Sequence, residues 1–162
     1  MKIEHLEERV NDYKESIRTV VEKKTVWKQT TKKLIHSILT TIENQYPIGW
    51  EVQELSWIGN NEAVNINFYA FPPELIDCTN QIPAYQFIGG SALVFSQMHN
   101  GDVYIFIMFP LVESSSQESN IQELGVFKPT DISEKLIVEK VDEFLKEMIQ
   151  WEVPSLKNRI GF

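Results

Sequence analysis

Apolar residues recur at alternating steps of three and four over the first 38 positions of the chain. The series begins with Ile3, Leu6, Val10, Tyr13, Ile17 and Val20, and continues through Lys24, Trp27, Thr31, Leu34 and Ile38. This spacing places one stripe along a helix that faces a single partner. It predicts a long helix over residues 1–43. At 1.5 Å per residue that helix would be roughly 60 Å long, more than the width of a compact domain of this size, so it must project from the fold or break.

Two polar residues, Lys24 and Thr31, occupy stripe positions in the middle of this predicted helix. A break is most easily placed within residues 25–31, where four β-branched residues and Trp27 lower the helix propensity. We prefer one continuous helix and keep the break as the alternative. Pro47 ends the helix, because a proline disfavours helical backbone in the residue before it.

A first β-hairpin is predicted after the helix, with strands over residues 50–58 and 63–71. A turn at Asn60-Asn61 would pair Leu55 with Ile66 and Trp57 with Val64. Alternating polarity in the second of these strands indicates one buried face and one solvated face.

Asn100-Gly101, the strongest turn signal in the chain, predicts a second hairpin. A two-residue turn there pairs Met98 with Val103 and gathers a mixed aromatic face: Phe95, Tyr104, Phe106 and Met108. Away from the turn both faces are apolar, so this hairpin needs a cover on both sides. The aromatic face is interpreted as a ligand or partner surface, or else as core beneath a helix or in a homodimer interface.

The last third of the chain contains a polar connection and a second helix. The serine-rich segment 113–129 is predicted to be a flexible loop. A helix follows Pro129 and extends to about Trp151, with its apolar stripe at Ile137, Val141, Phe144, Leu145 and Met148. Residues 1–162 are therefore expected to form one two-layer α+β domain in the order α-β-β-β-β-α, with a four-stranded antiparallel sheet. That order is similar to the order in small acidic secretion chaperones and adaptor domains, and fold alone does not imply function.

Charge is distributed unevenly along the chain. The 15 basic and 23 acidic residues give a net charge of −8. Residues 1–15 carry three basic and five acidic groups (−2), residues 16–36 six and one (+5), and residues 37–162 six and 17 (−11). The basic patch is Arg18, Lys23, Lys24, Lys28, Lys32 and Lys33. It either docks nucleic acid, anionic lipid or an acidic protein surface, or it complements the chain's own acidic helix or a twofold mate, or it is a solvated face. We prefer the second and third interpretations, and nucleic acid is not expected, because the surrounding −11 repels phosphates.

Catalytic, metal and cofactor motifs are not found in the sequence. His99 and Asp102 would form a diad beside the predicted turn, but an exposed ion pair is the preferred interpretation, and no catalytic residue is assigned. No metal-ligand spacing or cofactor motif occurs. The single cysteine, Cys78, has no intramolecular disulfide partner. No signal peptide and no apolar run of membrane-spanning length are present, so we expect a cytoplasmic protein without a membrane span.

These features favour a non-enzymatic protein-interaction module, an acidic adaptor, chaperone or inhibitor that acts as a homodimer. The alternative is a small-molecule-binding domain with an aromatic-lined pocket between sheet and helices.

Overall fold

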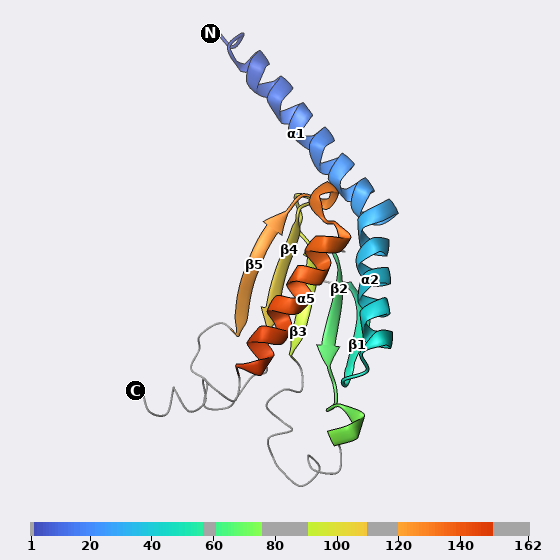
Figure 1. Cartoon of the computed structure of the whole chain (residues 1–162). Coiled ribbons are helices and arrows are strands. Elements are labelled where there is room, and N and C mark those ends of the chain that lie inside the picture. Colours follow the sequence, from blue (N-terminus) through green and yellow to red (C-terminus); the bar gives the residue numbers. More distant parts are fainter. Residues whose placement is uncertain (1, 57–60, 76–90, 110–119, 151–162) are drawn as a thin grey trace, which may run out of the picture.

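The computed structural model describes residues 2–56, 61–75, 91–109 and 120–150, and shows an antiparallel sheet with helices on one side and a projecting N-terminal helix (Figure 1). The helices are α1 (Leu6–Val26), α2 (Lys32–Gln45) and α5 (Glu134–Ile149). The strands are β1 (Trp50–Ser56), β2 (Glu62–Phe68), β3 (Ala92–Gln97), β4 (Val103–Met108) and β5 (Ile121–Phe127). Short 3₁₀ turns occur at Pro73–Leu75 and Pro129–Asp131. The α+β class with an antiparallel sheet is confirmed.

The strands follow one another across the sheet in the order β1-β2-β3-β4-β5, and every neighbouring pair is antiparallel. The expected number of four strands is therefore wrong by one. Strand β5 lies in the segment 113–129, which the serine-rich composition had assigned to a flexible loop. Residues 113–119 lie outside the described part of the chain, and most of the remainder of that segment is strand.

The N-terminal helix passes through residues 25–31 without a break. Its path changes locally instead, because Trp27–Thr31 form a π turn between α1 and α2. This turn buries Trp27 completely and Thr31 almost completely. The hydroxyl of Thr31 donates a hydrogen bond of 3.0 Å to the carbonyl oxygen of Pro129. The polar residue in the apolar series is thus buried with its hydroxyl group hydrogen-bonded. It lies at a π turn, and such turns inside helices often occur at functional sites.

Helices α2 and α5 pack on the same face of the sheet and form the main core with it. The fully buried members include Ile35 and Leu39 of α2 and Ile137 and Phe144 of α5. Opposite them the strands contribute their inward side chains: Trp50, Val64, Ile66, Phe68, Leu93, Phe95, Val103, Ile105 and Ile107. The expected stripe of α5 is confirmed, and the side chain of Ser133 caps this helix by accepting a 3.2 Å hydrogen bond from the Leu136 amide.

The expected pairing of the first hairpin is wrong by three residues. Leu55 pairs with Ala63 instead of Ile66, and Trp50 pairs with Phe68. A shift by an odd number exchanges the two faces of β1, because side chains alternate along a strand. Trp50 thereby reaches the core, where its ring stacks on Phe68 at a centroid distance of 5.6 Å. Trp57, expected opposite Val64, lies outside the described residues.

The expected pairing of the second hairpin is wrong by one residue. The Met98 amide donates to the Asp102 carbonyl oxygen at 2.7 Å, so three residues form the loop instead of two. Gly101 closes this loop with a φ of +91°, as the glycine of a three-residue hairpin loop typically does. The extra residue moves Phe95 to the core face and leaves Tyr104, Phe106 and Met108 on the other face.

Ile105→Ala tests this register through the main core. Ile105 is fully buried beneath the helices, so truncating its side chain is expected to lower the free energy of unfolding by about 2–5 kcal/mol. Val126→Ala, on the partly exposed outer face of β5, is the control and should cost under about 1 kcal/mol. Urea denaturation followed by circular dichroism measures both values. Similar losses in the two variants would contradict the assignment of faces.

Candidate functional site

Six apolar side chains on one side of α1 and of the turn before it are 45–66% exposed. They are Ile3, Leu6, Val10, Tyr13, Ile17 and Val21, and together with half-buried Val20 we call them the α1 stripe. None of the residues of α1 is buried. Single exposed apolar residues are ordinary, whereas a continuous row of this length on a projecting helix marks an interaction surface (Figure 1).

The last turn of α1 rests on the tip of the β3–β4 hairpin. The ammonium of Lys23 lies 2.8 Å from an Asp102 carboxylate oxygen, and both side chains are about four-fifths buried. Gly101 makes this approach possible, since a Cβ atom there would stand 2.5 Å from the Cβ of Lys23. The hairpin tip therefore supports α1 where it leaves the domain, next to half-buried Val20, and the rest of the stripe extends beyond that support.

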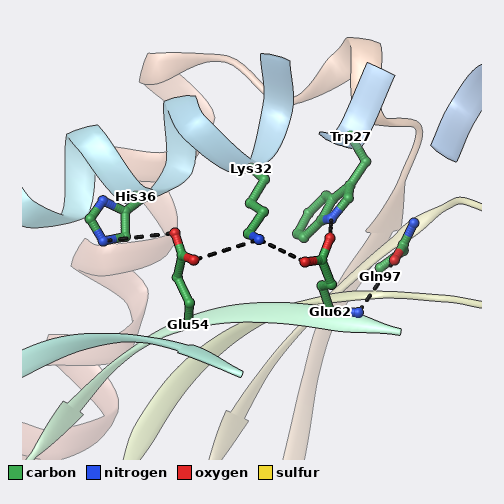
Figure 2. Close-up of polar contacts among 6 residues, drawn as sticks. All are labelled: Trp27, Lys32, His36, Glu54, Glu62 and Gln97. Atoms are coloured by element: carbon green, nitrogen blue, oxygen red, sulfur yellow. Dashed lines mark hydrogen bonds and ion pairs between the residues drawn. The ribbon is translucent and has the colours of Figure 1, made fainter. Parts of the chain in front are cut away.

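A polar network joins the start of α2 to the sheet (Figure 2). The ammonium of Lys32 lies 2.7 Å from one carboxylate oxygen of Glu62 and 3.5 Å from one of Glu54. His36, one turn further along α2, places its Nε2 atom 3.9 Å from the other oxygen of Glu54. The positive charge of Lys32 on α2 thus lies between the negative charges of Glu54 on β1 and Glu62 on β2.

Trp27 and Gln97 extend this network on the other side of Glu62 (Figure 2). The indole Nε1 of Trp27 donates to the second carboxylate oxygen of Glu62 at 3.3 Å. The Glu62 amide donates to the side-chain oxygen of Gln97, also at 3.3 Å. Because Trp27 is fully buried, its N–H group needs an acceptor, and Glu62 supplies one.

The network keeps its central pair ionised. The hydrogen bond from Lys32 lowers the pKa of the Glu62 carboxyl below its ordinary value of 4.5, although burial acts in the opposite direction. The hydrogen bond to Glu62 likewise raises the pKa of Lys32 above 10.5, again against the effect of burial. Shifts in these directions move both groups away from neutral pH, whereas a general acid or base works best with a pKa near the operating pH. The arrangement is that of a structural ion pair.

The basic patch divides into paired and unpaired members. Carboxylates of the chain itself pair with Arg18 (Glu15, 2.9 Å), Lys23 (Asp102) and Lys32 (Glu62 and Glu54). Lys24 is half-buried, while Lys28 and Lys33 are exposed. The intramolecular partners of Arg18, Lys23 and Lys32 therefore lie on α1, on the hairpin tip and on β1 and β2, and not on a separate acidic helix.

Three of the four residues of the predicted aromatic face lie together on one face of the sheet, and the fourth, Phe95, lies on the other. Phe95 is fully buried in the main core. On the opposite face Phe106 is buried and its ring lies 4.9 Å from that of Tyr104, with Met108 half-buried beside them. Phe95 therefore cannot line one pocket with Tyr104 and Phe106, which removes the residues on which the small-molecule alternative was based.

The described residues bring together no group of three or more His, Cys, Asp and Glu side chains that could hold a metal ion. Asp102 pairs with Lys23 at 2.8 Å and is about four-fifths buried, so the preferred interpretation, an exposed ion pair of Asp102 with His99, is wrong in both partner and exposure. Cys78 lies outside the described residues. No helix among those described is long and apolar enough to cross a membrane.

Sequence reasoning missed the network because its acidic members are recognisable only from the register. Glu54 and Glu62 lie on the same face of the sheet as Val64, at the end where α2 begins. The expected register placed Glu54 on the solvated face. The signal that could have found the pair is the combination of Lys32 at the start of the buried helix with two carboxylates on even-numbered strand positions.

Comparison with known proteins gives no significant match to any protein-family model, curated protein or solved structure.

Glu62→Gln tests the network through its pH dependence. Because the pKa of Glu62 is lower in the folded protein than in the unfolded chain, its stabilising effect is complete above about pH 4.5 and is lost as the pH falls through the folded value. The variant should lose about 1 kcal/mol of unfolding free energy at pH 7, and the difference from the wild type should shrink below pH 4.5.

Urea titrations from pH 7 to pH 3 measure this difference. Glu139→Gln makes the same chemical change on the exposed side of α5 and should alter the free energy of unfolding by under about 0.5 kcal/mol throughout. A Glu62→Gln curve that runs parallel to the wild-type curve over the whole range would contradict the role assigned to the Glu62 carboxylate.

Proposed function

We propose that this protein is a non-enzymatic interaction module that acts as a homodimer, with the α1 stripe as its contact surface. The single observation that carries the proposal is the continuous exposure of the stripe on a helix that leaves the domain. The class of protein is an acidic adaptor, chaperone or inhibitor of the cytoplasm.

The lack of packing along most of α1 supports this role. Helical stability in proteins comes mainly from packing an apolar face, and isolated helices are marginal in water. None of the 21 residues of α1 belongs to the buried core, and only the last turns touch the hairpin tip, where the side chain of Lys23 is largely covered. A partner that covers the stripe would supply the missing packing, so contact and helix order are coupled.

The spacing of the stripe favours a helical partner. Steps of three and four repeated from Ile3 to Val20 keep the apolar side chains on a narrow seam, which is the pattern of a coiled coil. The seam spans nearly three heptads, and every one of its positions up to Lys24 is apolar or tyrosine. A second copy offers the same seam, and twofold pairs are the commonest form of soluble oligomer.

The ionisable groups support binding in preference to catalysis. Among the described residues, the Lys32 network joins several ionisable side chains, and its central ion pair links α2 to strand β2. Its lysine and carboxylate have pKa values displaced away from neutrality, so neither is suited to proton transfer at pH 7.

Val10→Glu tests the proposal. Val10 lies in the middle of the stripe and is 48% exposed, so the substitution leaves the core intact and places a charge in the seam of each copy. Dimerisation is expected to weaken at least about 100-fold, equivalent to about 2.7 kcal/mol. Sedimentation equilibrium at micromolar concentrations measures the dissociation constant.

Asn11→Glu is the matched control, because it adds the same side chain at the neighbouring exposed position, off the stripe. This variant should dimerise as the wild type does. A wild-type protein that sediments as a monomer at these concentrations, or a loss of dimer equal in the two variants, would overturn the proposal.

A further inference from the structure

We infer that the two copies pair their α1 helices antiparallel, with Val10 of each opposite Tyr13 of the other, so that the two sheets lie at opposite ends of the dimer. The inference rests on the proposed function and adds the orientation and register of the contact. It follows from the order of side-chain sizes along the stripe, the charges beside it and the charge of the domain.

The side chains of the stripe are self-complementary in the antiparallel direction. With Val10 opposite Tyr13, Leu6 faces Ile17 and Ile3 faces Val20, and each pairing occurs twice by symmetry. The six layers use every member of the series from Ile3 to Val20. The bulky ring of Tyr13 meets the small Val10, which suits the alternation of large and small side chains in a packed interface.

A parallel pair would place identical residues opposite one another. Two Tyr13 rings would then share one layer, and the two Lys24 ammonium groups would meet in the next polar layer. A lysine at such a position lowers the stability of a coiled coil. In the antiparallel register Lys24 lies one turn beyond the Ile3–Val20 layer, outside the six apolar layers.

The charges beside the stripe favour the same orientation. Glu7 and Lys14 both follow a stripe residue directly, one after Leu6 and one after Tyr13. In the antiparallel register Glu7 of each copy lies beside Lys14 of the other, an attractive pair. In a parallel pair Arg9 of each copy would lie beside Lys14 of the other and repel it, while Lys2 would lie beside Glu7. The antiparallel register brings Lys2 near Lys23 of the other copy, but the charge of Lys23 is already paired with Asp102 of its own chain.

The charge of the domain adds a further reason. Residues 37–162 contain six basic and 17 acidic groups, a net charge of −11 in each copy. A parallel pair would bring both domains to the same end of the seam, where two surfaces of like net charge repel each other more than when they are far apart. The antiparallel pair separates them by the length of α1, which projects away from its own domain (Figure 1).

Spin labels at three equivalent positions test the orientation. Glu4, Asn11 and Arg18 are spaced by seven residues on the same side of the helix, off the stripe. Each is replaced by cysteine in a Cys78→Ser background, labelled with a nitroxide, and studied by pulsed dipolar spectroscopy on the full chain. At 1.5 Å per residue, antiparallel pairing offsets the two labels along the seam by roughly 22 Å at position 4, by under about 2 Å at position 11 and by roughly 20 Å at position 18.

The expected result is therefore a short distance at position 11 between two long ones. Three equal distances would overturn the antiparallel inference and leave the homodimer standing. Labelled protein that shows no intermolecular distance at any position, and sediments as a monomer, would overturn the homodimer itself. Lys24→Ile gives a second criterion, since it should leave the dissociation constant unchanged in the antiparallel dimer and lower it at least about tenfold in a parallel one.

Discussion

The anchorage of the π turn on the sheet determines how the rest of the molecule is arranged. Trp27 is fully buried there, Thr31 is bonded to the carbonyl of Pro129, and Lys32 is paired with Glu62. After this point, the apolar face of α2 packs in the core. Before it, the same spacing of apolar residues continues, but the domain lies too far away to cover them. One sequence pattern therefore serves two environments, and the anchorage sets the boundary between them.

The sequence predicts well those features that depend on periodicity alone. The long helix, the stripe of α5 and the antiparallel class need only the positions of apolar residues relative to one another. Hairpin registers depend on how many residues the turn contains, and the pattern does not show this number. Gly101 is compatible with a two-residue or a three-residue loop, and the difference of one residue decides whether Phe95 lies in the core or on the opposite face.

The candidate site likewise contains one part that periodicity predicts and one part that depends on strand register. The α1 stripe is visible in the sequence, whereas its exposure depends on where the helix leaves the domain. Glu54 and Glu62 read as ordinary strand residues until the register turns both toward Lys32. Strand β5 was hidden for a different reason: it closely follows a serine-rich stretch, and a bulge at Leu124, between the partners of Ile105 and Phe106, interrupts its apolar alternation.

Burial explains why association through α1 need not disturb the domain. The main core is closed by α2 and α5, and no residue of α1 belongs to it. The unsupported part of α1 is therefore free to respond to a partner, while the Lys23–Asp102 contact and the π turn hold its base in a fixed direction. Under the proposed function, a partner that covers the stripe would stabilise the helix, because isolated helices are marginal in water and packing of an apolar face supplies most helical stability. Contact at α1 would then change assembly without requiring any change in the domain, since the core that holds the sheet and helices together contains no residue of α1.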